Sequence, residues 1–312
     1  ATAGGRDAAG LAKALDRGCA GISYGVEYIP GITRDELMAT AAPCQKDGKL
    51  ISAHIRTDDP REVPDAIGEI IALGERYHAP VQISHIGSMA GFGQVPAALA
   101  LMDRSRANGL DVMCDCYPYD AFSTHIGSSA FDNQWIERNG CEYSVLEITR
   151  GKYQGQRCTK EMFDELRRDD PMCLVVCHSI QPGMMEAALT HPSVILASDG
   201  LMDHGQGHPR AAGAFPRFLA TLVRDGKVSL YDAIDKMTAM PARRLGLTQK
   251  GRLIVGADAD VVIFDPDTVA DKATFLEPAL APVGIEYVLM NGEIAMQNGK
   301  ILRGDLGRGL RK

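Results

Sequence analysis

Short, nearly continuous runs of apolar residues recur along the first part of the chain. They lie at residues 21–24, 50–55, 80–86, 110–116, 173–178 and 193–198. Each run is short, and its apolar residues do not alternate with polar ones, which is typical of strands buried on both faces of a parallel sheet. The pattern therefore predicts about six buried strands in that sheet.

Segments of helical length separate these runs. They cover residues 34–47, 63–77, 94–108, 160–169 and 184–190. The first strand starts are about 30 residues apart, which is the length of one βα unit. Strands that alternate with helices in this way predict an α/β fold. Because the interval between residues 116 and 173 is longer, we expect an inserted excursion there.

The pattern changes after residue 199. A loop rich in Gly and His precedes two predicted amphipathic helices at residues 215–224 and 230–245, the second capped by Ser229. Short β segments then follow at residues 251–253, 259–264, 285–290, 293–296 and 300–302. Asn-Gly pairs, which favour tight hairpin turns, join the later segments. We predict an α/β barrel domain over residues 1–249 and the C-terminal part of a small β-sandwich domain over residues 250–312.

Polar side chains sit at the carboxyl ends of the predicted strands. They are His54, His85, Asp115, His178 and Asp199. A (β/α)8 barrel of the TIM type places its active site at this end, and a doubly wound sheet also binds ligands there. The residue types favour the barrel, because imidazole and carboxylate groups from different strands are typical zinc ligands. Neither GxGxxG nor GxxxxGK follows the first strand, so a phosphate-binding glycine loop is not expected.

Composition and charge exclude several classes of protein. The net charge of -7 among 312 residues argues against nucleic acid as a partner. No apolar run approaches the roughly 18 residues that a membrane span requires. The 8 cysteines form no CxxC pair and are too sparse for a disulfide scaffold. We therefore expect a cytoplasmic protein with free thiols. The sequence leaves its oligomeric state open.

Several motifs resemble a known family. The segment from Met237 to Asp265, which includes Lys250-Gly251-Arg252-Leu253, is similar to the end of the metal-dependent amidohydrolase superfamily. A narrower resemblance is to the N-acyl-D-amino-acid deacylase (D-aminoacylase) branch. It is carried by Ala53-His54-Ile55-Arg56, Ile83-Ser84-His85, Tyr117-Pro118-Tyr119, Ser198-Asp199-Gly200 and His208-Pro209-Arg210. It implies a (β/α)8 TIM-type barrel and hydrolysis of the amide bond of N-acyl-D-amino acids.

The resemblance also implies roles for individual residues. His54, His85 and Asp199 would bind one or two Zn²⁺ ions, and Asp199 would also be the catalytic general base. Arg210 would bind the α-carboxylate of the substrate. Tyr117 and Ser123 would contact the substrate as well, and Tyr117 could polarise the scissile carbonyl.

Other polar residues have simpler interpretations. We interpret His178 as a structural residue or as one that supports a ligand from behind. His204 and His208, in the Gly-rich loop, are interpreted as solvated residues or as part of a lid. Cys114 and Cys116 are interpreted as core thiols.

The chain also departs from the family pattern. It contains no His-x-His pair, no cysteine in the family's ligand position, and only about six of the eight barrel strands. We therefore expect the first strands to be missing. Three hypotheses stay open: a portion of an N-acyl-D-amino-acid deacylase, a catalytically incomplete fragment or non-catalytic scaffold of the same fold, and a cyclic-amide hydrolase of the hydantoin or dihydropyrimidine type. The third hypothesis is disfavoured, because the chain has no lysine in an obvious bridging position.

Overall fold

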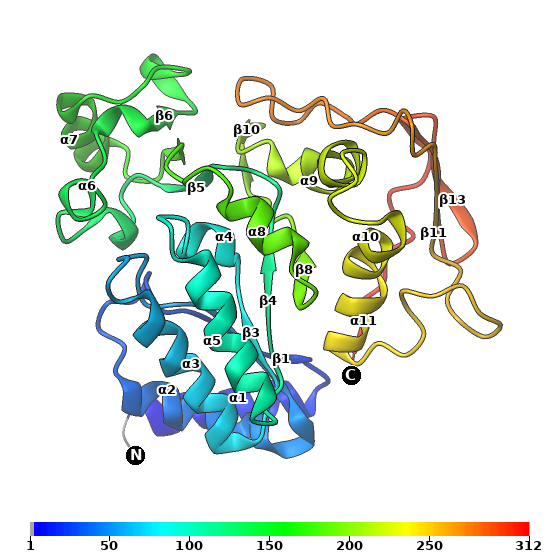
Figure 1. The fold of residues 1–312 in the computed structure, drawn as a ribbon, viewed down its shortest axis with the longest axis horizontal. Helices are drawn as coiled ribbons and strands as arrows, with labels where there is room; N and C mark the ends of the chain where they lie inside the picture. The colour runs from blue at the N-terminus through cyan, green and yellow to red at the C-terminus, as the bar shows by residue number, and fades with distance from the viewer. Residues whose placement is uncertain (1–2, 312) are drawn as a thin grey trace. The chain divides into compact units, whose positions relative to one another are not determined.

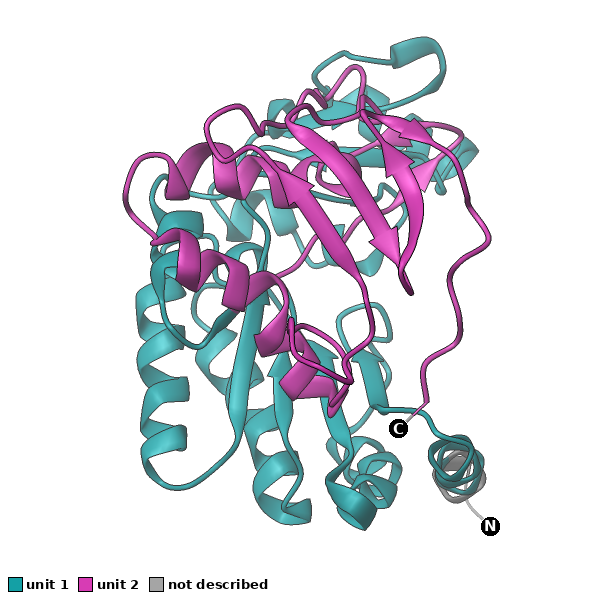
Figure 2. Ribbon diagram, turned by 90° about the vertical axis from the view of Figure 1, so that its right-hand side faces the viewer, with its two compact units in different colours: residues 1–194 teal, residues 195–312 magenta. Residues whose placement is uncertain are grey.

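A computed structural model describes residues 3–311 of the chain and divides it into two compact units, residues 1–194 and 195–312. Figure 1 shows the fold and Figure 2 colours the two units. The predicted boundary at residue 249 lies inside the second unit and stays a prediction.

The first unit begins with parallel βα repeats. Its elements up to residue 116 are α1 (Ala3–Asp16), β1 (Gly21–Gly25), α2 (Arg34–Ala41), β2 (Leu50–His54), α3 (Val63–Tyr77), β3 (Val81–Ile83), α4 (Ile86–Met89), α5 (Val95–Ala107) and β4 (Val112–Cys116), with a 3-10 segment η1 (Ala42–Gly48). The strands β1, β2, β3 and β4 pair in parallel in chain order. This confirms the α/β fold and the parallel sheet expected from the sequence.

The parallel register aligns apolar side chains in rows across the sheet. Ile22 pairs with Ile51, Ile51 with Val81, and Val81 with Val112, and all four side chains are buried. Helix α3 packs on β3, and at Gly74 an added Cβ would lie 2.4 Å from a Val81 methyl group. The glycine is therefore required for this close approach of helix and strand.

The chain between β4 and β8 forms an inserted module. Its elements are β5 (Phe122–His125), η2 (Ser129–Phe131), α6 (Trp135–Arg138), η3 (Tyr143–Val145), β6 (Leu146–Ile148), η4 (Gly151–Tyr153), α7 (Lys160–Asp169) and β7 (Leu174–Cys177), followed by α8 (Met184–Thr190) and β8 (Val194–Leu196). The predicted excursion is confirmed. One expectation is wrong: the run at 173–178, predicted as a strand of the parallel sheet, is β7, which pairs antiparallel with β5 and β6 in a sheet of its own.

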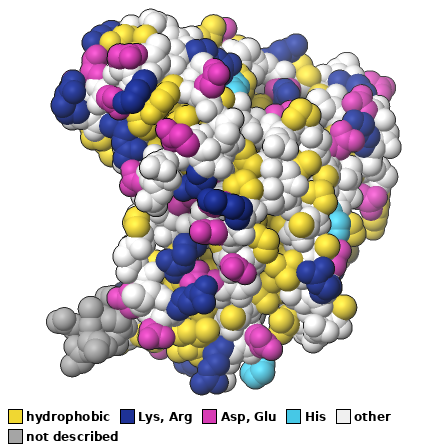
Figure 3. Space-filling view, turned by 60° about the vertical axis from the view of Figure 1, so that its left-hand side comes forward, with side chains coloured by type: hydrophobic (Ala, Val, Ile, Leu, Met, Phe, Trp, Pro, Cys, Tyr) yellow, Lys and Arg dark blue, Asp and Glu magenta, His cyan; other side chains and the backbone are white. Residues whose placement is uncertain are grey.

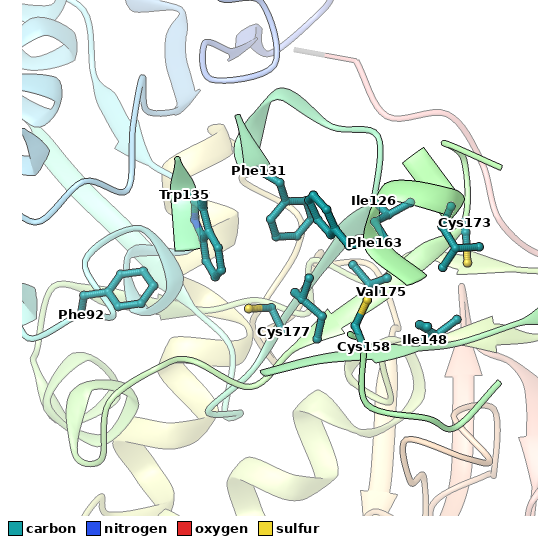
Figure 4. Close-up of a cluster of buried hydrophobic side chains, with 12 residues drawn as sticks. Phe92, Ile126, Phe131, Trp135, Ile148, Cys158, Phe163, Cys173, Val175 and Cys177 are labelled. Atoms are coloured by element: carbon teal, nitrogen blue, oxygen red, sulfur yellow. The ribbon is translucent and has the colours of Figure 1, made fainter. Parts of the chain in front are cut away.

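A separate apolar cluster gives the module its own core. Figure 4 shows Phe131 and Trp135 beside Phe163, with Val175 and Cys177 of β7 in the same cluster. Because β7 contributes four buried residues in succession, it is covered on both faces, like a strand of a parallel sheet. This double burial explains why the sequence pattern alone assigns the run to the wrong sheet.

The second unit combines helices with an antiparallel sheet. Its elements are β9 (Met202–Asp203), β10 (Gln206–Gly207), α9 (Arg210–Phe218), a π-helical turn η5 (Leu219–Val223), α10 (Leu230–Met237), α11 (Ala239–Leu245), β11 (Val261–Phe264), β12 (Ile285–Met290), β13 (Glu293–Gln297) and β14 (Lys300–Ile301). Ser229 caps α10 as predicted. The predicted strand at 251–253 is wrong, because these residues form no strand.

Hairpin turns order the C-terminal strands. β11, β12, β13 and β14 pair antiparallel in chain order. The turn residues Asn291, Gly292, Asn298 and Gly299 all have positive φ, which a two-residue type I′ hairpin turn requires. The two Asn-Gly signals in the sequence are therefore confirmed as turns.

Candidate functional site

The two histidines predicted as metal ligands lie together at the carboxyl ends of neighbouring strands. His54 is the last residue of β2, and His85 follows β3 and precedes α4. Nδ1 of His54 is 3.0 Å from Nε2 of His85. Both side chains are largely buried. The register of the parallel sheet brings them together, because β2 and β3 are adjacent and end at the same edge.

Each imidazole is also held through the nitrogen that points away from the other ring. Nε2 of His54 lies 2.8 Å from Oε2 of Glu27, and Nδ1 of His85 lies 3.0 Å from Oγ of Ser88. Oγ of Ser88 also lies 2.9 Å from the carbonyl oxygen of His85. These contacts limit where the ring protons can lie.

An ionised carboxylate only accepts hydrogen bonds, so a neutral His54 carries its proton on Nε2 and a lone pair on Nδ1. Ser88 has a single hydroxyl proton, which leaves two arrangements for His85. If the carbonyl oxygen of His85 takes this proton, Ser88 accepts from Nδ1 and Nε2 of His85 keeps its lone pair; if Nδ1 takes it, Nε2 of His85 carries a proton and donates to Nδ1 of His54. In the first arrangement two lone pairs face each other across 3.0 Å, and a cation bound by both nitrogens would remove their repulsion. In the second arrangement a hydrogen bond joins the two rings, and Nδ1 of His54 is still the acceptor.

The backbone of His85 is fixed by a carboxylate on the next strand. His85 has a φ of 35°, which for a residue with a side chain costs about 1–3 kcal/mol. Its N–H donates to Oδ1 of Asp115 at 2.8 Å, and Gln82 donates to the other oxygen of Asp115 at 2.7 Å. Asp115, one of the strand-end residues, therefore orients the His85 backbone.

The histidine pair has the chemistry and spacing of zinc ligands. Zinc binds histidine nitrogens at about 2.0–2.1 Å in tetrahedral geometry, so two such nitrogens are about 3.3 Å apart. The distance between the two facing nitrogens is 3.0 Å, a few tenths of an ångström shorter. Among residues 3–311, no group of three or more His, Cys, Asp or Glu side chains is arranged to hold a metal ion. The two histidines thus fit as a pair of ligands rather than as a full set.

Asp199 and Arg210 form a second pair, in the second unit. Oδ2 of Asp199 lies 3.0 Å from Nη2 of Arg210; the arginine side chain is 3% exposed and the aspartate side chain 41%. Asp199 has a φ of 49°. A Cβ at Gly200 would lie 2.7 Å from Cα of Ala211, so the glycine allows the Asp199 loop to approach the start of α9, where Arg210 lies.

The other predicted residues are distributed over several elements. Tyr117 is buried just after β4, and Ser123 lies in β5 of the module, opposite Val176. Their contact with a substrate stays a prediction. Nε2 of His178 lies 3.0 Å from Oε2 of Glu147 in β6, and its interpretation as a structural or supporting residue stays a prediction. His204 is exposed, but the interpretation of His208 as solvated is wrong: it is fully buried, packs on Phe275 and accepts a hydrogen bond from the Arg210 N–H.

The inserted module contacts the loops that surround the histidine pair. Trp135 donates to Oδ2 of Asp58 at 2.7 Å, and Arg138 donates to Oδ1 at 2.6 Å. Ser129 donates to the backbone oxygen of Glu27 at 2.7 Å. Burial, with the charge of Glu27 second, raises the pKa of Asp58 to about 6. The module therefore holds the loops that follow β1 and β2.

Sequence reasoning missed Glu27 and Ser88. Glu27 follows the end of β1 by two residues, so, like the histidines, it lies at the carboxyl end of a strand. The apolar run at residues 21–24, however, ends three residues before it. Ser88 lies one helical turn after His85.

The surface in Figure 3 shows acidic and basic side chains interspersed. None of the described helices has the length and apolar character needed to cross a bilayer.

Comparison with known proteins gives consistent matches. Residues 71–296 match the sequence profile of the Amidohydrolase family. The N-acyl-D-glutamate deacylase of Alcaligenes xylosoxydans xylosoxydans is 35% identical over 297 residues, which are 90% of this chain and 59% of that protein. The D-aminoacylase of the same organism is 32% identical, again over 90% of this chain and 59% of the relative. The chain thus spans less than two thirds of the length of these curated relatives.

Solved structures of N-acyl-D-amino-acid deacylases also match this chain. The crystal structure of N-acyl-D-glutamate deacylase from Bordetella bronchiseptica, complexed with zinc and a phosphonate inhibitor, matches with a TM-score of 0.82 at 32% identity, over 95% of this chain and 65% of that chain. A D-aminoacylase crystal structure matches with a TM-score of 0.83 at 28% identity, over 96% and 64%. These matches confirm the predicted TIM-type fold class. A D-hydantoinase structure, at 15% identity and a TM-score of 0.51, shares the fold alone.

Proposed function

Because the chain belongs to the amidohydrolase family, we propose that it carries out metal-dependent hydrolysis of the amide bond of N-acyl-D-amino acids, releasing a carboxylate and a D-amino acid. The observation that carries the proposal is the convergence of two imidazole nitrogens, Nδ1 of His54 and Nε2 of His85, at 3.0 Å. A neutral imidazole nitrogen without its proton is a good metal ligand, and the deacylase relatives agree with hydrolysis of N-acyl-D-amino acids.

In this proposal His54 and His85 bind Zn²⁺, with Asp199 as a further ligand. The family site holds one or two ions. A bound zinc ion supplies an acidified water molecule and polarises the amide carbonyl. The crystal structure of the deacylase relative with zinc is consistent with this ion.

Asp199 is the proposed general base. Its carboxylate takes a proton from the attacking water and delivers it to the nitrogen of the leaving amine, so that one carboxylate serves both steps. Its side chain is 41% exposed, which leaves it accessible to water and to a substrate.

Arg210 is the proposed binding group for the α-carboxylate of the substrate. Its guanidinium has five N–H donors in a planar fork, so one edge can hold Asp199 while another holds the substrate. Burial of this side chain strengthens its attraction for an anion because solvent screening is weak there. Tyr117 and Ser123 are the proposed hydrogen-bonding partners of the substrate, with the Tyr117 hydroxyl donating to the scissile carbonyl.

A side-by-side assay tests the reaction. N-acetyl-D-glutamate, other N-acetyl-D-amino acids, their L-enantiomers and hydantoins are incubated with the zinc-loaded protein, and the released amine or the opened ring is measured. We expect release of D-amino acid and little ring opening. Ring opening of hydantoins without hydrolysis of linear amides would instead identify a cyclic-amide hydrolase. Failure with every substrate, together with failure to bind zinc, would indicate the non-catalytic alternative.

A further inference from the structure

We propose that Glu27 is the positioning residue of the histidine pair: it fixes the Nε2–H tautomer of His54 and thereby aims the Nδ1 lone pair at the metal position. This inference deepens the proposed function and rests on it for the presence of a metal. The contact that carries it is the 2.8 Å hydrogen bond between Nε2 of His54 and Oε2 of Glu27.

The placement of Glu27 suits this role and no direct one. Glu27 bonds the nitrogen of His54 that points away from His85, so the imidazole ring stands between its carboxylate and the convergence point. It therefore cannot bind the same ion as Nδ1 of His54 and Nε2 of His85. A carboxylate behind a metal-binding histidine orients the ring and makes it a better ligand.

Glu27 is itself held in place. Its side chain is 8% exposed and that of His54 is 12% exposed, so the hydrogen bond is shielded from competing water. The backbone oxygen of Glu27 accepts from Ser129 of the inserted module at 2.7 Å. The ring centroid of Tyr28 lies 4.5 Å from that of the His54 imidazole. The ring consequently has little freedom to rotate.

A purely structural ion pair is the competing explanation. In that case His54 would be a protonated imidazolium that donates from Nδ1 to Nε2 of His85 and from Nε2 to Glu27. A metal would have to displace that proton, and removal of the Glu27 charge would make the proton easier to lose. The two explanations therefore predict opposite effects of Glu27 substitution on zinc affinity.

The first measurement is zinc affinity of the full chain, by competition with a chromophoric chelator. We expect the Kd for zinc to rise about 10–100-fold in Glu27→Ala. A smaller rise is expected in Glu27→Gln, whose amide oxygen still accepts from Nε2 without the charge. Asp35→Asn is the matched control, because Asp35 is an exposed carboxylate in the first turn of α2, and its affinity should equal that of the wild type. Unchanged or tighter zinc binding by the Glu27→Gln protein would overturn the proposal.

The second measurement needs neither metal nor activity. With only 8 histidines in the chain, selective ¹⁵N-histidine labelling and NMR at about pH 8, above the ordinary histidine pKa of ~6.5, reports each tautomer in zinc-free protein. The His54 signals are assigned by their loss in His54→Asn. We expect an Nε2–H tautomer in the wild type and a mixture in Glu27→Gln. An imidazolium, or an Nδ1–H tautomer, in the wild type would overturn the proposal.

The zinc-affinity and NMR measurements distinguish failure of the proposed role of Glu27 from failure of the proposed reaction. A wild-type protein that shows the Nε2–H tautomer and loses zinc affinity on Glu27 substitution, yet hydrolyses no acyl amino acid, would refute the proposed reaction and leave the role of Glu27 intact. Circular dichroism and the fluorescence of Trp135, the only tryptophan, establish that each variant is folded. If Glu27→Ala does not fold, the near-isosteric Glu27→Gln carries the test.

Discussion

The histidine pair and the Asp199–Arg210 pair are held in different ways. His54 and His85 follow adjacent buried strands, and each ring has a partner behind it, Glu27 or Ser88. Asp199 lies in a loop with its side chain 41% exposed, and its side chain forms an ion pair with Arg210. The first arrangement is fixed by the sheet register and by buried hydrogen bonds. The second depends on one close approach, that of Gly200 to Ala211.

The difference indicates a division of labour. Ligands for a metal must be preorganised, because a site that has to be rearranged binds more weakly. A proton-transferring carboxylate must instead reach both water and the leaving group, so some exposure and freedom are useful. Substitutions in the histidine pair should therefore reduce zinc binding, whereas substitutions in the Asp199–Arg210 pair should reduce turnover or substrate binding.

The largest expected effect is on turnover. In Asp199→Asn we expect kcat to fall about 10²–10⁴-fold, the range for loss of a general base. Bound zinc should stay close to the wild-type amount, because His54 and His85 remain and asparagine keeps a side-chain oxygen that can bind the ion. His85→Asn is the contrasting variant and should lose zinc together with activity. Steady-state kinetics and metal analysis of both proteins check this. If Asp199→Asn hydrolyses its substrate at the wild-type rate, Asp199 is not the base.

An intermediate effect is expected for substrate binding. Arg210→Gln removes the charged fork, and a charged hydrogen bond contributes about 1.5–3 kcal/mol, so kcat/KM for an N-acyl-D-amino acid should fall about 10–100-fold. An N-acyl amine without a carboxylate serves as the control substrate. Because Arg210 also pairs with Asp199, hydrolysis of this substrate should fall, but less than hydrolysis of the N-acyl-D-amino acid. An equal loss with both substrates would show that Arg210 acts on the structure of the loop rather than on the carboxylate.

The smallest expected effect is on stability. It concerns Asp58, which accepts hydrogen bonds from Trp135 and Arg138 of the inserted module. Because the pKa of Asp58 is raised to about 6 from an ordinary 3.8, the folded state binds this proton more tightly than the unfolded state. The associated stabilisation is complete below about pH 3.8 and is lost as the pH rises through about 6. Relative to Asp58→Asn, the wild type should therefore lose on the order of 1–3 kcal/mol of unfolding free energy between about pH 4 and 7.

Chemical denaturation followed by Trp135 fluorescence measures this difference. Asp59→Asn is the matched control, because hydrogen bonds from Arg61 lower the pKa of Asp59 to about 2. The stability that Asp59 contributes is present above pH 3.8 and is lost only as the pH falls toward 2, outside the tested window. Parallel pH curves for the wild type and Asp58→Asn would contradict the expectation.

Strand-end histidines were predictable, whereas their partners were not. His54 and His85 each follow an apolar run, and the common edge of parallel strands brings such residues together whatever the loops do. Glu27 is separated from His54 by 27 residues, and Trp135 from Asp58 by 77. Local periodicity contains no information about contacts over such separations. The contacts of Glu27 and Asp58 can therefore be identified only in the tertiary structure.

The sequence by itself determined the alternation of strands and helices, the hairpin turns at Asn291-Gly292 and Asn298-Gly299, and the edge at which the histidines gather. All of these follow from short-range periodicity and backbone preferences. Tertiary structure decided the sheet to which β7 belongs, the burial of His208, and which nitrogen of each imidazole faces the other. Those properties depend on what covers a strand or stands behind a ring, and packing between distant segments alone sets them.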